Sequence, residues 1–330
     1  MVDRARLLFW LRLAVGVAIL AAVLALVDTG RVWEALKALP PAAFALAAIV
    51  NAAGSIVVPA IITSHTLQAG SIRLPLAELV RINLVMRFYV LILPHAVTVG
   101  MRWFRYRRQA GQGWQAAALI VFERVVQFAV IVTSAFVFLL AARDGLPPEL
   151  RILVPVSAAL ALLALAVFLC FVSRPVFARV EPVIGALARV APQFVATRVQ
   201  RLVEAVAGFQ QLGNRRVGFV IAWSVAGHLL FVASAWIVCR AMQLPVGFVD
   251  IGWMRSAVLL LTVLPITVGG IGVREAGFAG LLYLHGADRA VALAFPLALL
   301  AIQLLIGAVG ALIELAGVLA RRRKEADALH

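Results

Sequence analysis

The chain has 330 residues, of which 64% are apolar and only 14% are charged, and its mean hydropathy is +1.04. A soluble domain is roughly half apolar, so this composition excludes an ordinary soluble enzyme and predicts an integral membrane protein. The net charge of +15 does not indicate a nucleic-acid partner, because the basic residues lie in short segments between apolar runs and form no basic domain.

Long apolar runs with little or no charge recur along the chain. They are 7–27, 42–63, 125–142, 152–172, 217–239, 256–273 and 290–313. About 20 such residues form a helix long enough to cross the ~30 Å hydrocarbon core of a bilayer. The runs are continuous and do not alternate with polar residues, which favours helices over barrel strands. We therefore predict an all-α polytopic membrane protein with one transmembrane domain over residues 1–330.

The first run, 7–27, is preceded by Arg4 and Arg6 and contains Arg12. A basic start followed by an apolar run also describes a secretory signal peptide, but no small-residue cleavage pattern follows Val27. We interpret this run as an anchor and the first span.

Basic residues are unevenly divided among the segments that connect the runs. Twenty of the 30 lie in 1–12, 64–81, 102–112, 173–216 and 320–330. Only seven lie in 28–41, 143–151, 240–255 and 285–289. The positive-inside rule makes the first set cytoplasmic and the second external, with both termini cytoplasmic. We expect a bacterial inner membrane, where anionic lipid headgroups are the nearest partners of the inner charge.

Two apolar stretches conflict with this assignment if they are simple spans. Residues 82–101 separate two cytoplasmic segments, and residues 256–284 separate two external ones. We therefore predict that each stretch enters and leaves on one side as a re-entrant helical hairpin. Pro94 breaks the first and Pro265 the second, because proline interrupts a helix interior.

The two hairpins share a faint motif. Leu93-Pro94 leads to Gly100 and Arg102, while Leu264-Pro265 leads to Gly269 and Arg274. We interpret Gly100 as a further helix-break residue.

The predicted order is span, span, hairpin, span, and it occurs twice. Residues 1–142 and 152–320 are then half-repeats of inverted orientation, with about six full spans and two hairpins in total. Transporters often have this plan, and their substrate site lies where the repeats meet. An eight-helix bundle with two kinked spans is the alternative, because proline and glycine are common in membrane helices.

Ionisable residues inside apolar sequence usually pair or line a polar cavity. They are Arg87, Glu123, Arg124, Arg274, Glu275 and Glu314. We expect all but Glu314 to converge, with Arg102, on a site at the broken centres of the hairpins. Glu123 and Arg124 have an alternative role as interfacial snorkelling charges. Glu314 is interpreted as an end charge that pairs with Arg321–Arg323.

Gly269, Gly270 and Gly272 precede Arg274 in the second hairpin. Glycine permits positive φ and close backbone approach, and the start of a half-helix suits a phosphate or carboxylate. The planar fork of Arg274 matches phosphate oxygens, and Glu275 can hold that fork when the lipid is absent.

Residues 173–216 carry arginines among apolar residues and contain Pro182 and Pro192. We predict one or two amphipathic helices at the cytoplasmic interface, broken at these prolines. A partner-docking surface is the alternative. Cys170 and Cys239 lie inside apolar runs, so no disulfide is expected, and the five histidines form no metal-binding pattern. No metal or cofactor is expected.

The run from Leu264 to Glu275, LPITVGGIGVRE, resembles the signature of the lysylphosphatidylglycerol synthase transmembrane, or flippase-like, family. Pro94, Gly100 and Arg102, and then Glu123-Arg124, are similar to its earlier motifs, although Met101 departs from them. The resemblance implies a lipid-handling domain, which in bifunctional members is associated with moving aminoacylated phospholipid across the bilayer. A separate soluble domain makes that lipid. Only eleven residues follow Leu319, so we expect no lipid aminoacylation.

Two classes of function remain. We favour a non-enzymatic flippase or transporter of an anionic phospholipid or a lipid-linked phosphate. The alternative is a membrane-embedded transferase, or an accessory subunit, of a lipid-linked sugar or polyisoprenoid pathway. A transferase needs a general base or metal-binding carboxylates, and no Asp-x-x-Asp or His-Asp arrangement occurs in the apolar sequence.

Overall fold

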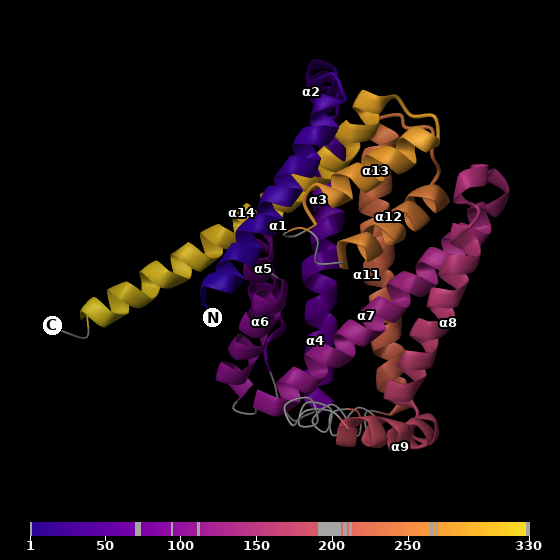
Figure 1. Ribbon diagram of the computed structural model, residues 1–330. Coiled ribbons are helices and arrows are strands. Elements are labelled where there is room, and N and C mark those ends of the chain that lie inside the picture. The colour runs from indigo at the N-terminus through magenta and orange to yellow at the C-terminus, as the bar shows by residue number, and fades with distance from the viewer. Residues whose placement is uncertain are drawn as a thin grey trace.

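The computed structural model describes residues 2–69, 74–93, 95–110, 113–190, 206, 210, 213–263, 267 and 270–327. This part of the chain is helical and contains no β-strand (Figure 1), as predicted for an all-α membrane protein. Its α-helices are α1 (Val2–Ala25), α2 (Thr29–Lys37), α3 (Pro41–Ala52), α4 (Val58–Ala69), α5 (Leu76–Ile92), α6 (His95–Ala110), α7 (Gly113–Ala142), α8 (Leu153–Val172), α9 (Arg174–Val190), α11 (Asn214–Ala241), α12 (Phe248–Val263), α13 (Val273–Leu284) and α14 (Arg289–Asp327). A π-helical turn, η1 (Ala53–Val57), joins α3 to α4, and the 3₁₀ turns η2 (Arg143–Gly145) and η3 (Pro148–Leu150) connect α7 to α8.

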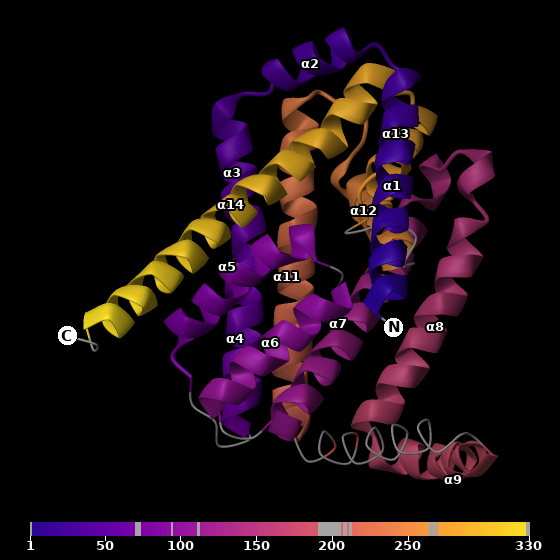
Figure 2. The same ribbon diagram turned by 60° about the vertical axis from the view of Figure 1, so that its left-hand side comes forward.

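The helices run alternately up and down the molecule (Figures 1 and 2). α1 rises to α2 at the top, α3 and α4 descend, and α7 rises before α8 descends to α9, which lies across the bottom. α11 rises again, and α14 descends to the C-terminus. The pair α5–α6 lies in the lower half and the pair α12–α13 in the upper half.

The expected membrane spans are present. Five helical segments are long and apolar enough to cross a bilayer, and a sixth is obtained when α1 and α2 are taken together across a 93° bend. The five are Pro41–Gln68, Ile120–Gly145, Pro148–Val172, Asn214–Ala241 and Arg289–Leu319. The polytopic membrane class predicted from the apolar runs is therefore confirmed.

Large side chains and close helix crossings hold the bundle together. Trp253, Phe278 and Phe295 are fully buried and join α12, α13 and α14. α14 packs against α5 where Gly307 and Gly310 leave room for side chain and backbone of that helix. Small residues of this kind allow membrane helices to approach closely. The crossing fixes α5 against α14, the last span.

The interfacial segment differs from its prediction at one residue. α9 runs without interruption from Arg174 to Val190 and contains Pro182. Proline removes only one backbone donor and bends a helix without always ending it, so the expected break at Pro182 is wrong. Pro192 lies outside the described residues.

Candidate functional site

The glycine motif forms a tight turn that leads into α13. Gly270 has a φ of 74° and Gly272 a φ of 84°, a backbone region that side-chain-bearing residues rarely adopt. A Cβ atom on Gly272 would meet the backbone oxygen of Gly16 in α1, and one on Gly270 would lie 2.7 Å from Thr262 Cγ2. Glycine is therefore required here by both conformation and space. Pro265 and Gly269 lie outside the described residues.

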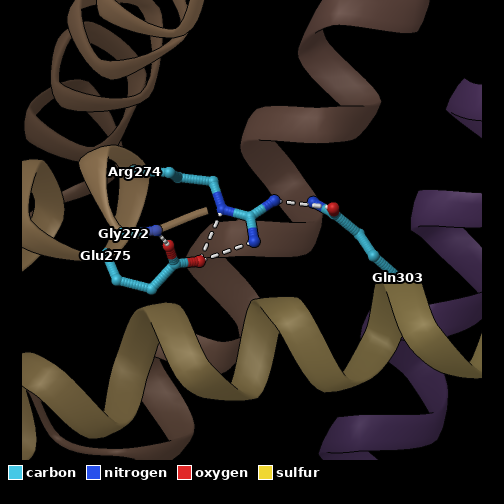
Figure 3. Close-up of polar contacts among 4 residues, drawn as sticks. All are labelled: Gly272, Arg274, Glu275 and Gln303. Atoms are coloured by element: carbon cyan, nitrogen blue, oxygen red, sulfur yellow. Dashed lines mark hydrogen bonds and ion pairs between the residues drawn. The ribbon is translucent and has the colours of Figure 1, made fainter. Parts of the chain in front are cut away.

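Glu275 organises the start of α13 (Figure 3). Its Oε2 atom accepts a hydrogen bond from the Gly272 N–H at 2.7 Å. Its Oε1 atom accepts from Arg274 Nε at 2.9 Å and Arg274 Nη2 at 2.6 Å. Arg274 Nη1 donates to Gln303 Oε1 on α14 at 2.6 Å. The side chain of Glu275 is fully buried and that of Arg274 is 13% exposed.

This arrangement leaves Arg274 only partly occupied. A guanidinium carries five N–H donors, and its partners among the described residues use one on each of the three nitrogens. One N–H on Nη1 and one on Nη2 remain for a ligand. Glu275 was expected to hold the guanidinium of Arg274, and it forms hydrogen bonds to that group. Gln303 on α14 binds the same guanidinium.

Arg87 lies on α5 and contacts the π-helical turn of the second span. Its Nη2 atom donates to the backbone oxygen of Ser55 at 2.7 Å, and Asn83 Nδ2 donates to the backbone oxygen of Ile56 at 3.2 Å. A π-turn widens the helix locally and is frequent at functional sites. The widened turn thus receives two polar side chains from α5.

Gly100 does not break a helix. It lies inside α6, which begins at His95 directly after the position of Pro94, and the space around it is open. Glycine costs only about 1 kcal/mol inside a helix, so α6 continues through it, and the prediction of a break there is wrong. Pro94 lies outside the described residues.

Glu123 is buried between α7 and α4, which excludes the alternative of an interfacial snorkelling charge. Its Oε1 atom accepts hydrogen bonds from Thr63 at 3.0 Å and Thr66 at 3.1 Å, and it interacts electrostatically with Arg102 and Arg124. Arg124 itself is exposed and donates to Gln127 Oε1 at 3.2 Å.

Arg255 was not predicted as a site residue, because its position in segment 240–255 indicated a loop charge. Arg255 lies inside α12 with its guanidinium 4.8 Å from the centre of the Phe231 ring. Its Nε atom is buried and has no hydrogen-bond partner among the described residues. The neighbouring Ser256 hydroxyl lies 3.2 Å from His228 Nε2. The available signal was a single arginine within the otherwise apolar stretch 251–263.

Arg255 lies near arginines of two different helix pairs. It lies near enough to Arg274 of α13 and to Arg87 of α5 for their like charges to repel one another. Arg87 also interacts with Arg102 and Arg124. We call these five residues the arginine network: Arg87, Arg102, Arg124, Arg255 and Arg274.

The arginine network carries more positive than negative charge. Its neighbouring carboxylates are Glu123 and Glu275. Within the described residues, no ion pair joins Arg87, Arg102 or Arg255 to a carboxylate. Four of these guanidinium groups are part-buried and the fifth, of Arg124, is exposed. Guanidinium groups near one another favour an anion, above all a phosphate, whose oxygens match their fork.

Glu314 has partners that the sequence did not predict, whereas the side chains of Arg321–Arg323, its expected partners, lie outside the described part of the chain. Its Oε1 atom accepts from Arg105 Nη2 at 2.6 Å and from the Tyr89 hydroxyl at 3.1 Å. It therefore joins α14 to both α5 and α6 and belongs to a separate polar cluster.

Comparison with known proteins identifies the family. No curated protein and no solved structure matches the chain. The model of one family, described as the lysylphosphatidylglycerol synthase TM region, matches residues 9–310, which include every helix that contributes to the arginine network. The chain therefore belongs to the lysylphosphatidylglycerol synthase TM region family.

Proposed function

We propose that this protein is a lipid flippase that binds an anionic phospholipid or a lipid-linked phosphate and moves its headgroup across the bilayer. The observation that carries the proposal is the arginine network, in which part-buried arginines from two separate helix pairs, together with the exposed Arg124 of α7, lie near enough for their like charges to repel one another. An uncompensated charge in the membrane is costly, so intramembrane arginines usually mark a substrate path.

The arrangement of the helix pairs supports transport. α5–α6 lies in the half of the molecule that contains α9, and α12–α13 lies in the opposite half (Figures 1 and 2). We interpret them as re-entrant hairpins that enter from opposite faces, within inverted repeats 1–142 and 152–320. Their inner ends would meet near the midplane, where transporters of this plan bind substrate.

The headgroup would bind through hydrogen bonds that the protein leaves open. Arg274 offers two N–H groups and Arg255 offers its buried Nε–H. Arg87 can exchange the Ser55 backbone oxygen for a phosphate oxygen, which accepts a stronger, charge-assisted hydrogen bond. The acyl chains would stay in the surrounding lipid while the headgroup passes.

The orientation follows from the charge distribution. We place the face with α9 and both termini in the cytoplasm of a bacterial cell and the face with α2 outside, because basic segments favour the cytoplasmic side. Single cysteines at Asp250 and Gly286 should then react with an impermeant thiol reagent from outside, and one at Arg105 only after permeabilisation. Labelling of Asp250 and Gly286 from opposite faces would contradict the hairpin interpretation.

Reconstitution into liposomes tests the function directly. Transfer of headgroup-labelled phosphatidylglycerol between leaflets should fall at least about tenfold in Arg255→Gln and Arg274→Lys, since each loses hydrogen bonds worth roughly 1.5 kcal/mol or more. Arg31→Gln is the matched control, because Arg31 pairs with Asp288 at the exposed end of the bundle. Wild-type rates in well-folded Arg255→Gln and Arg274→Lys would refute the proposal. Recovery of a covalently altered lipid would favour the transferase.

A further inference from the structure

A cavity lies between α5, α6 and α14, and none of its described lining residues belongs to the arginine network. Its volume is about 860 Å³, within the usual range of small-molecule sites. Charged residues from all three helices line it, together with the aromatic side chains of Tyr89, Trp103 and Phe104.

Among the residues that the structure describes, two ion pairs line the cavity. Arg105 Nη2 lies 2.6 Å from Glu314 Oε1, and Arg81 Nε lies 3.0 Å from Glu78 Oε2. The cavity is therefore balanced in charge, whereas the arginine network has an excess of arginine. A purely anionic ligand gains little from such a balanced site, because each guanidinium already faces a carboxylate.

Among the described residues, Glu314 accepts hydrogen bonds at only one of its two carboxylate oxygens. Its Oε1 atom accepts from both Arg105 and Tyr89, and within the described residues its Oε2 atom accepts no hydrogen bond. Arg105 likewise uses one Nη2–H on Glu314 and retains further donors. Both side chains are about one quarter exposed. The pair thus presents an open acceptor and open donors to the same cavity.

The aromatic residues suit an amphiphilic ligand with a cationic group. The Arg105 guanidinium already lies 5.8 Å from the centre of the Tyr89 ring, which shows that this ring can face a cation. Phe104 is 59% exposed and Val97 is 46% exposed, so the edge of the cavity presents apolar surface where lipid chains can pack.

We propose that this cavity is a binding site for a phospholipid whose headgroup carries both a phosphate and a primary ammonium group. The phosphate binds to Arg105 and Arg81, and the ammonium binds to Glu314 Oε2 beside the Tyr89 ring. Each end of the headgroup meets the opposite charge, so binding leaves no buried charge without a partner. The site does not depend on the proposed transport activity.

Quenching of Trp103 fluorescence by lipids with brominated acyl chains measures binding at this cavity. The signal of Trp103 is the difference between the purified full-length chain and Trp103→Phe. Phosphatidylethanolamine should half-quench Trp103 at an about fivefold lower lipid fraction than phosphatidylglycerol with the same chains, as expected for one ammonium–carboxylate contact. Glu314→Gln should remove this preference. Glu34→Gln is the matched control, because Glu34 is 71% exposed and pairs only with nearby Lys37.

Three results would overturn the proposal. One is equal quenching of the wild-type protein by the two lipids, which requires no variant. Another is an unchanged preference for phosphatidylethanolamine in a Glu314→Gln variant whose melting temperature equals that of the wild type. If Glu314→Gln does not fold, an unchanged affinity of Arg81→Gln for both lipids would overturn the proposal instead. The third is full displacement of brominated phosphatidylethanolamine by an equal concentration of glycerophosphoethanolamine, which would assign the cavity to a soluble molecule.

Discussion

Glu275 holds two parts of the second helix pair at once, and Glu275→Gln tests how much the fold depends on it. The carboxylate accepts the Gly272 N–H at the start of α13 and two N–H groups of Arg274. The amide of glutamine is nearly isosteric but uncharged. It keeps one acceptor oxygen, so it can satisfy Gly272 or Arg274 but not both as the carboxylate does.

The magnitude follows from burial. Removing one partner of a buried ion pair costs about 3–5 kcal/mol. Arg274 retains 13% exposure and its bond to Gln303, so we expect the lower end, about 3 kcal/mol. At roughly 2 °C per kcal/mol for a chain of this size, Tm should fall by about 6 °C. Thermal unfolding in detergent, followed by intrinsic fluorescence, measures this shift.

A double variant separates charge from shape. Arg274→Gln with Glu275→Gln removes the unpaired cation, so it should melt above Glu275→Gln alone. The exposed Glu34→Gln should melt within about 1 °C of wild type, because exposed pairs contribute little. If Glu275→Gln melts at the same temperature as Glu34→Gln, the buried pair does not stabilise the start of α13, which contradicts the prediction.

Two other perturbations probe the ends of the second half. Gly272→Ala should destabilise the protein by about 1–3 kcal/mol because Gly272 has a positive φ. Gly280→Ala, in open space on α13, should be neutral or stabilising by less than about 1 kcal/mol. Equal melting temperatures of the two variants would refute the requirement for glycine at position 272. Partial burial raises the pKa of Asp288, but the Ala290 N–H and the Arg31 guanidinium outweigh it, so the pKa is lowered. The ionised carboxylate therefore stabilises the fold at pH values above the ordinary aspartate pKa. This stabilisation is lost as the pH falls and the carboxylate is protonated. The melting difference between wild type and Asp288→Asn should therefore shrink on acidification from neutral pH to about pH 3, and a difference that grows would contradict the assignment.

Sequence reasoning found the spans because the membrane imposes a simple rule. A helix must present about 20 apolar residues to lipid, and the runs 42–63 and 217–239 satisfy it without reference to any partner. The positive φ of Gly270 and Gly272 was likewise expected from the residue type, because glycine adopts such angles without steric cost.

Partners between distant helices were harder to predict. Arg255 was assigned to a loop because two basic residues in 240–255 fitted the external charge pattern, although its own neighbours are apolar. Glu314 was expected to pair with Arg321–Arg323 because they are near in sequence, and the ion pair that it forms with Arg105 on α6 was not foreseen. Charge and spacing predict that a side chain needs a partner, but only helix packing determines which one it meets.

The contact between Gly16 and Gly272 also has a consequence for biogenesis. α1 packs against α13 through a backbone approach that leaves no room for a side chain on either partner. The ribosome delivers α1 long before α13, so the first helix has no permanent neighbour at this position during most of synthesis. It must remain inserted without that contact while the intervening helices assemble, and it docks only when the glycine turn has formed. Substitutions at Gly16 should then act late, on maturation of an already inserted chain, and leave targeting and membrane integration intact.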